Sequence, residues 1–132
     1  MHSVIYPYKR WGFQPVPIVP ITLFGVRDKV VAEAYVDSGA ACSIFDRSIA
    51  ELLKIDLKYA RRRLFRVGNG ESIHGLVIKI PVQIGDHRFV SEVAFSEDLR
   101  IGFNLMGRRG MFEAFEAVIF REKAWEVEFV VS

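Results

Sequence analysis

The sequence predicts an all-β fold, in which about ten short strands and one or two small helices close into a β-barrel. The 132-residue chain has the length of one ordinary domain, and it breaks into short apolar runs separated by turn residues. The longest runs alternate between apolar and polar residues, as strands with one wet face do. Helical spacing occurs in one short segment. We expect a single folded domain without an internal repeat or linker.

The composition predicts a large core and gives no reason to expect nucleic acid. Hydrophobic residues make up 51% of the chain and aromatic residues 13%, so either the core is rich or a partner covers apolar surface. The 18 basic and 16 acidic residues are mixed along most of the chain and leave a net charge of +2. The one basic cluster, ARRRLFR at residues 60–66, is interpreted as a solvated edge.

Cysteine content and hydropathy predict the compartment. A single cysteine, Cys42, excludes a disulfide within the chain and suits a reducing environment. No stretch approaches the ~18 continuous apolar residues of a membrane span, and the first residues lack the order of a signal peptide. We expect a cytoplasmic protein with no membrane partner.

The first segment is predicted to be extended. Residues 1–19 are interpreted as an N-terminal arm and residues 20–132 as the folded domain. Pro15, Pro17 and Pro20 lack backbone donors and fix φ, which excludes a helix and disfavours a central strand. The arm is therefore expected to be extended or to form an edge strand.

A hairpin and a tight turn are predicted next. The apolar runs at residues 21–26 and 30–36 are joined by the short polar link 27–29. Residues 37–43, DSGAACS, are too small and polar to continue the strand, and an extended piece follows at 43–45. One face of the second run is predicted to carry Ala32, Ala34 and Val36.

One helix and a series of hairpins complete the prediction. Asp46 is a suitable N-cap, and apolar residues recur at helical spacing behind it, so a helix is expected at residues 46–53. Asn69 and Gly70 tolerate the positive φ of a hairpin tip. Further strands are expected at residues 76–84 and 88–95, then a strand, a tight turn and a helical turn within 101–112, and a last hairpin from 115–122 and 125–131.

Asp37 is the first candidate for chemistry. A carboxylate at the end of an apolar strand must be solvated by the protein if water cannot reach it freely. Ser38 offers a hydroxyl, and Gly39 and Ala40 expose backbone N–H groups that no large side chain blocks. The alternative is that Asp-Ser-Gly only forms a turn with an Asx-type hydrogen bond.

The order of three motifs resembles the retropepsin-like aspartic proteases. The matching segments are YVDSGAACSIF at residues 35–45, the glycine-containing hairpin VGNGESIHG at 67–75, and LMGRRGMF at 105–112. The hairpin before Asp37 also fits, so the resemblance covers about residues 20–121. It implies the acid-protease β-barrel, with one lobe per chain.

The resemblance implies a homodimer that hydrolyses polypeptides. Single-domain members supply one catalytic Asp per chain, and the sequence contains no second Asp-Ser/Thr-Gly. The missing carboxylate is then Asp37 of a second copy, and the arm and residues 125–131 are candidates to interleave between subunits. Two alternatives stay open: a non-catalytic dimeric module that binds peptides on the same fold, and pairing with a different chain.

The resemblance also assigns roles to individual residues. Two close carboxylates share one proton and activate a water between them, so no metal or other cofactor is needed. Residues 66–76 would form a flap over an extended peptide, although a plain hairpin would look much the same. The catalytic residues implied are Asp37, Ser38 and Gly39. Those implied to bind substrate are Ala40, Val67, Gly68, Asn69, Gly70, His74, Leu105 and Met106, and those implied to give structural support are Gly107 and Arg108.

Other readings of these residues remain. Leu105 and Met106 can equally be plain core. Relatives often have acidic residues just after the Asp-Thr-Gly-Ala motif, where this chain has Ala41 and Cys42. The contacts that hold the substrate should therefore differ. Cys42 is expected to be a small core residue, the alternative being an oxidation-sensitive thiol near the site. No recognised metal-site spacing links Cys42 with His2, His74 or His87.

Overall fold

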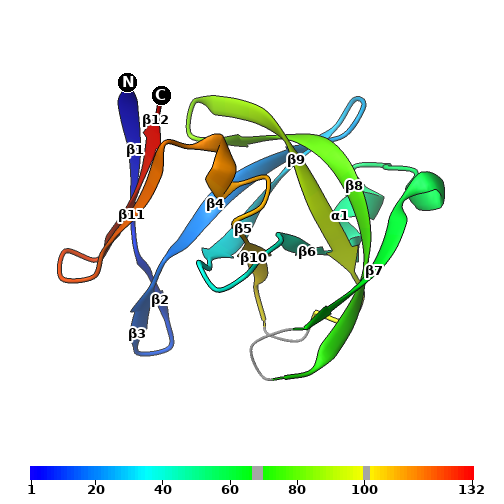
Figure 1. Cartoon of the computed structure of the whole chain (residues 1–132), viewed down its shortest axis with the longest axis horizontal. Helices are drawn as coiled ribbons and strands as arrows, with labels where there is room; N and C mark the ends of the chain where they lie inside the picture. Colours follow the sequence, from blue (N-terminus) through cyan, green and yellow to red (C-terminus); the bar gives the residue numbers. More distant parts are fainter. Residues whose placement is uncertain (67–69, 100–101) are drawn as a thin grey trace.

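The computed structural model describes residues 1–66, 70–99 and 102–132, and these form an all-β fold, as predicted (Figure 1). The strands are β1 (His2–Pro7), β2 (Lys9–Trp11), β3 (Gln14–Val16), β4 (Ile18–Phe24), β5 (Lys29–Val36), β6 (Ile44–Asp46), β7 (Arg61–Arg66), β8 (Ser72–Ile84), β9 (His87–Ser96), β10 (Asn104–Met106), β11 (Ala117–Arg121) and β12 (Glu126–Val131). The helices are α1 (Arg47–Leu52) and two short 3-10 helices, η1 (Leu57–Tyr59) and η2 (Phe112–Ala114).

The main sheet is a ring of paired strands. Its order is β4-β5-β10-β6-β9-β8-β7, and β4 also pairs with β8. That closing contact is short, because only Thr22 with Gln83 and Leu23 with Val82 are in register. β7 lies outside the ring as an edge strand. The closed barrel itself stays a prediction.

The predicted first hairpin is confirmed. β4 and β5 are antiparallel in register from Ile18 with Tyr35 to Phe24 with Lys29. The Gly25 N–H donates to the Asp28 carbonyl over 2.8 Å and closes the turn. The residues predicted to share one buried face, Ala32, Ala34 and Val36, are all buried. Burial of this face packs β5 into the core, and Asp37 follows directly after the end of β5.

The helix and the meander also follow the prediction. The Asp46 side chain accepts a hydrogen bond from the Ser48 N–H and caps α1. β8 and β9 form a long antiparallel pair that turns between Ile84 and His87. The strand, turn and helical turn expected within residues 101–112 are β10 and η2 with the turn between them. The predicted hairpin tip at Asn69 lies outside the described residues.

Two hydrophobic cores fill the fold. The larger contains buried side chains from most strands and from α1, among them Phe45, Phe95 and Phe129. The smaller lies between β6, β7, β8, β9 and β10. Its buried members are Ile44, Phe65, Ile73, Val77, Ala94 and Leu105. Burial of Phe65 on β7 together with Ile44 on β6 therefore fixes the hairpin arm against the strand that follows the Asp37 loop.

The chain ends form a separate three-stranded sheet in the order β1-β12-β11 (Figure 1). The hairpin of β11 and β12 was predicted, but the pairing of β1 with β12, from His2 with Val131 to Pro7 with Glu126, was not. Because both edges of β12 are occupied within the chain, any pairing of this sheet with a second chain would use β1 or β11. The division of the chain at residue 20 and the interleaving of subunits stay predictions.

None of the helices in the described part of the chain is long and apolar enough to cross a membrane.

Glu128 joins the three strands of the terminal sheet. Its Oε2 accepts from the Ser3 hydroxyl, and its Oε1 lies 2.5 Å from Nη1 of Arg121. These two contacts, the Ser3 hydrogen bond first, lower the pKa of Glu128 from its usual 4.5. The ionised form is thus favoured in the folded state, so its contribution to stability is present above pH 4.5 and is lost as the pH falls through the folded-state pKa.

We expect Glu128→Gln to lower the melting temperature by a few degrees at pH 7, with the difference shrinking toward zero near pH 3 or below. Thermal unfolding followed by circular dichroism at both pH values measures this. Glu126→Gln on the same strand is the control, since Glu126 makes no side-chain hydrogen bond or ion pair within the described ranges. An equal difference at both pH values would contradict the role given to the Glu128 charge.

Candidate active site

Asp37 sits in a tight turn directly after β5. Its backbone N–H donates to the Met106 carbonyl over 3.0 Å, and its carbonyl accepts from the Ala40 N–H over 3.1 Å. The Gly39 N–H donates to Oδ1 of Asp37 over 2.8 Å. This is the Asx-type bond of the plain-turn interpretation. The turn leaves Asp37 only half-buried, so the turn and the chemical role are compatible.

The segment after β10 braces this turn. The N–H groups of Arg108 and Arg109 donate to the carbonyls of Ala40 and Ala41 over 2.9 and 2.8 Å. The Gly107 N–H donates to Oγ of the fully buried Ser43 over 2.9 Å. Backbone groups that would otherwise lack partners in the loop are thereby satisfied. The backbone of Gly107 and of Arg108 thus contacts the Asp37 turn, while the support roles that the resemblance implies for these residues stay predictions.

β10 holds the two ends of the turn together. It pairs in parallel with β5, where Met106 is opposite Val36, and antiparallel with β6, where Leu105 is opposite Ile44. β5 leads into the turn and β6 leads out of it. A single short strand therefore fixes both ends of the loop that carries Asp37.

An open groove of about 460 Å³ lies over Asp37. One side is formed by the Asp37 turn with Ile44 and Leu105, and the other by residues 63–66 of β7. Of the predicted site residues, the groove brings together Asp37, Gly39, Ala40 and Leu105. Such a groove between a rigid turn and a hairpin arm is open enough to admit an extended peptide.

Other predicted site residues lie elsewhere. Ser38 is exposed on the turn, and Met106 is fully buried in the larger core. Gly70 has the positive φ of +86° expected for a hairpin tip. His74 lines a different hollow of about 250 Å³, with Arg62 and Asp98. Val67, Gly68 and Asn69, which the resemblance implies to bind substrate, lie outside the described residues.

The sequence reasoning missed the contribution of β7 to the groove. Arg63, Leu64, Phe65 and Arg66 line it, although the cluster was interpreted as a solvated edge. Ile44 was missed as well. The position of β7 in the sequence could have indicated this contribution, because β7 leads directly into the predicted flap. A hairpin arm next to the flap tip must lie over the same groove as the tip.

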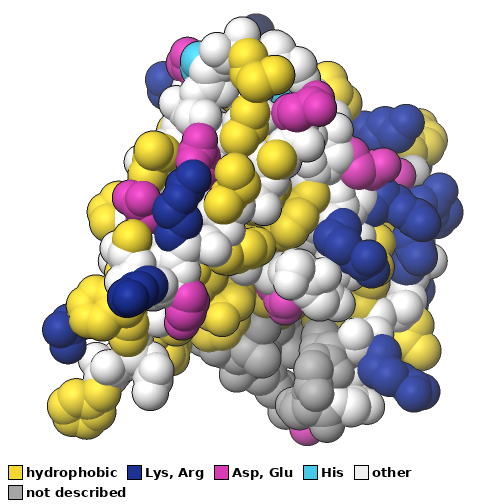
Figure 2. All heavy atoms as spheres, turned by 60° about the vertical axis from the view of Figure 1, so that its left-hand side comes forward, with side chains coloured by type: hydrophobic (Ala, Val, Ile, Leu, Met, Phe, Trp, Pro, Cys, Tyr) yellow, Lys and Arg dark blue, Asp and Glu magenta, His cyan; other side chains and the backbone are white. Residues whose placement is uncertain are grey.

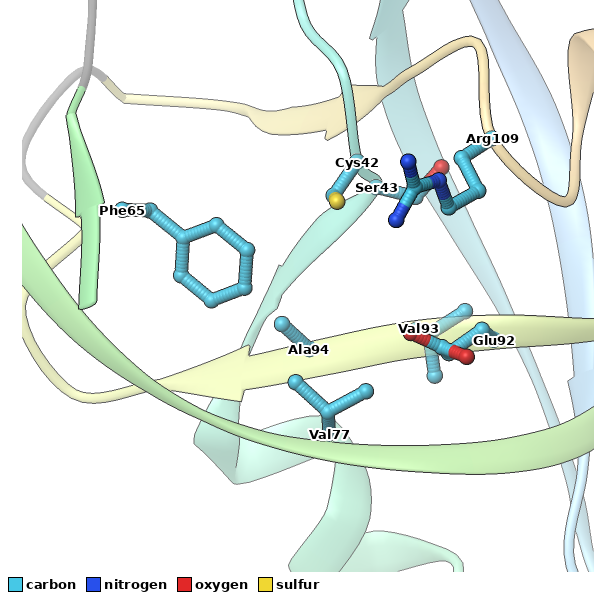
Figure 3. A pocket seen from close by; sticks show the side chains of 8 residues that line it. All are labelled: Cys42, Ser43, Phe65, Val77, Glu92, Val93, Ala94 and Arg109. Atoms are coloured by element: carbon cyan, nitrogen blue, oxygen red, sulfur yellow. The ribbon is translucent and has the colours of Figure 1, made fainter. Parts of the chain in front are cut away.

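A small hollow lies next to the groove, beside β7 (Figure 3). It has room for about 10 Å³, the space of roughly one water molecule. Cys42, Phe65 and Arg109 point into it above Val77 and Ala94 (Figure 3). Half-buried Cys42 packs against the smaller core, which is consistent with the expected role as a core residue, and it also lines the groove.

Tyr35 reports on the charge of Asp37. Burial, and then repulsion by the Asp37 and Glu122 carboxylates, raise the pKa of its phenol above 10.0. Its ring stacks on Phe103 with centroids 5.1 Å apart, and Trp11 meets Phe103 edge-on at 5.2 Å. An aromatic cluster therefore covers the end of β5 just before the turn.

No group of three His, Cys, Asp or Glu side chains in residues 1–66, 70–99 and 102–132 is placed to hold a metal ion.

Comparison with known proteins identifies the fold. No family model matches the sequence, and no curated protein resembles it significantly. Among solved structures, the chain is similar to a retropepsin-like aspartic protease from Rickettsia conorii, with a TM-score of 0.70 and 20% sequence identity. The alignment covers 98% of this chain and 99% of that chain. The chain therefore has a retropepsin-like fold over nearly its whole length.

Gly107 is the position where the brace is least tolerant of change. A Cβ there would lie 2.3 Å from the Cys42 carbonyl oxygen. Since backbone on both sides is hydrogen-bonded, we expect Gly107→Ala to lower the free energy of unfolding by about 3 kcal/mol or more in urea titration. The control is Gly12→Ala, where a Cβ meets nothing within 4 Å and only a positive φ of +65° is strained, a cost of about 1–2 kcal/mol. An equal loss of unfolding free energy in the two variants would contradict the bracing role given to the segment at Gly107.

The coupling of Tyr35 to Asp37 can be measured without an assay. We expect Asp37→Asn to lower the pKa of Tyr35, because the repelling charge is removed, while burial keeps it above its usual value. Ultraviolet titration of the phenols measures this, with Tyr35→Phe in each background to assign the signal. An unchanged Tyr35 titration would show that the two groups do not interact.

Proposed function

We propose that the chain is an aspartic endopeptidase that acts as a homodimer, with Asp37 of each copy supplying half of the catalytic pair. The observation that carries the proposal is the placement of Asp37. It directly follows a strand with one buried face, sits in a braced turn and lines an open groove in a retropepsin-like fold. Fold alone does not define activity, so the chemistry rests on this site.

The need for a second copy follows from the groove. Asp37 is the sole acidic residue among the described residues that line it. A lone carboxylate cannot both withdraw a proton from water and donate one to the peptide carbonyl. A two-fold axis near the groove would supply the second carboxylate as the same residue. Figure 2 shows a band of hydrophobic side chains on the face in view, which supports a surface that a second copy covers.

The proposed mechanism uses the shared proton of the pair. Two carboxylates held close together cannot both ionise at low cost, so one stays protonated. The ionised member takes a proton from a bound water, which attacks the peptide carbonyl, while the other donates its proton to the carbonyl oxygen. The Gly39 N–H, 2.8 Å from Oδ1, holds the Asp37 carboxylate in place. Ser38, exposed on the same turn, is proposed to hydrogen-bond across the dimer.

The hairpin of β7 and β8 is proposed to act as the flap. Its arms are in register from Arg61 with Val77 to Arg66 with Ser72. Phe65 anchors one arm in the smaller core. A peptide in the groove would then lie between the Asp37 turn and this arm. The enzyme is proposed to act in the cytoplasm.

Asp37→Asn is expected to reduce cleavage of a fluorescein-labelled unstructured polypeptide by about 1,000-fold or more between pH 3 and pH 7, because the proton relay needs a carboxylate. Gel separation and mass spectrometry detect the products. Sedimentation velocity should give the same dimer for both proteins.

The matched control is Asp28→Asn in the β4–β5 turn. It removes a surface carboxylate that lies 3.9 Å from Nζ of Lys54, and it should leave cleavage unchanged. Full activity of Asp37→Asn would refute the proposal. Peptide binding without turnover by the unaltered protein would favour the non-catalytic binding module, and a monomer at high concentration would favour pairing with a different chain.

A further inference from the structure

We infer that the groove selects peptides with an acidic side chain close to the scissile bond, and that Arg63 and Arg66 are the specificity-determining residues. The inference rests on the proposed function, because it names the substrate class of the same groove. It follows from the charges on the two walls of the groove and from how little of that charge is neutralised.

The wall formed by β7 is positive. Arg63 and Arg66 both line the groove, whereas Asp37 is the one acid among the described residues that line it. In the proposed dimer the Asp37 pair shares a proton, so each half of the groove carries more positive than negative charge. Guanidinium groups bind carboxylates through paired hydrogen bonds with matching geometry.

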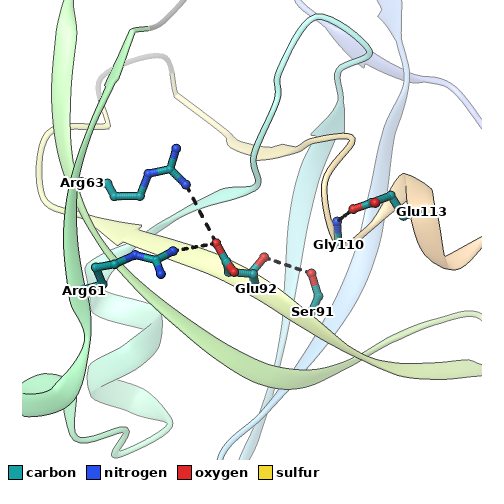
Figure 4. A network of polar contacts seen from close by, with 6 residues as sticks. All are labelled: Arg61, Arg63, Ser91, Glu92, Gly110 and Glu113. Atoms are coloured by element: carbon teal, nitrogen blue, oxygen red, sulfur yellow. Dashed lines mark hydrogen bonds and ion pairs between the residues drawn. The ribbon is translucent and has the colours of Figure 1, made fainter.

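Glu92 neutralises only part of this charge (Figure 4). Its Oε1 lies 3.2 Å from Nη2 of Arg61 and 4.0 Å from Nη1 of Arg63. One carboxylate therefore serves two guanidinium groups, and the closer one is Arg61. Arg63 also lies over the ring of Phe65, with its Cζ 5.3 Å from the centroid. This contact positions the guanidinium without using its donors, which stay available for a ligand.

Arg66 has no carboxylate partner among the described residues and ends β7 as an exposed side chain. It lies three residues from Arg63 along an extended strand, a span of about 10 Å. Side chains three residues apart point to opposite faces of a strand, but β7 is an edge strand, so a peptide lying along its free edge would pass Arg63 on one face and Arg66 on the other. Because a carboxylate beside the Asp37 pair would be repelled, the acidic residue should lie at least one residue away from the scissile bond.

The opposite wall offers no acid besides Asp37 among the described residues. Ala41 and Cys42 follow in the turn and line the groove, so no further carboxylate on this wall would bind a basic substrate side chain. Arg62, which directly precedes Arg63 on β7, instead lines the separate hollow that contains Glu97 and Asp98. Arg62 is thus a matched control on the same strand.

The test uses fluorescein-labelled octapeptides with Phe-Leu at the centre and Ala or Ser elsewhere. Each carries one Glu, or one Gln as its neutral match, at one outer position. Their Kd for the Asp37→Asn protein is measured by fluorescence anisotropy at pH 7 and low salt. We expect Glu to bind about three- to tenfold tighter than Gln in at least one position, and the ratio to fall as salt is added.

The same ratio is measured in three further variants of that protein. The double variant Arg63→Gln with Arg66→Gln should bring the ratio of Gln to Glu Kd values close to one. The double variant Arg63→Lys with Arg66→Lys should keep this ratio above one, and Arg62→Gln should leave it unchanged. Circular dichroism confirms the fold of each. A ratio of one or less at every position, no binding of any octapeptide, or the same ratio in the double Gln variant would overturn the inference.

Turnover of the same peptides by the unaltered protein separates the two proposals. Cleavage with equal kcat/KM for Glu and Gln peptides would leave the proposed function standing and overturn this inference. Glu-selective binding without any cleavage would support the inference for the groove and overturn the assignment as an endopeptidase.

Discussion

The site depends on the hydrogen bonds between the Asp37 turn and the segment after β10. The turn consists of small residues, which bury too little apolar surface to hold a fixed shape by packing. Its carbonyls instead accept from Arg108 and Arg109, and Ser43 accepts from Gly107. Because these donors are backbone groups, the arrangement does not depend on the arginine side chains. The carboxylate is thus held on one edge of a groove with little freedom to move.

Much of the fold could be predicted because its signals are local. The first hairpin, the Asp46 cap of α1 and the meander of β8 and β9 each follow from neighbouring residues in the sequence. The pairing of β1 with β12 could not, since it joins opposite ends of the chain and short strands carry no mark of their partner. The parallel insertion of β10 beside β5 was not predicted either, since it joins strands that lie far apart in the chain.

The site was predicted in part for a similar reason. Asp37 and its turn stand out because an acid after a buried strand is unusual, whereas the wall supplied by β7 looks like an ordinary charged edge. Which side chains of an edge strand face a groove depends on the twist of its hairpin, and residue order does not give that twist. The structure therefore adds the charge of the groove, from Arg63 and Arg66, to a predicted catalytic turn.

The central claim is that two copies of one turn make one catalytic centre. A crystal structure of the assembled protein tests it most directly, through the distance between the Asp37 carboxylates of neighbouring copies. The account predicts a two-fold axis beside the groove, with carboxylate oxygens within hydrogen-bonding reach, about 2.5–3.2 Å, or joined by one bound water. Asp37 carboxylates that lie far apart in every assembly would contradict it.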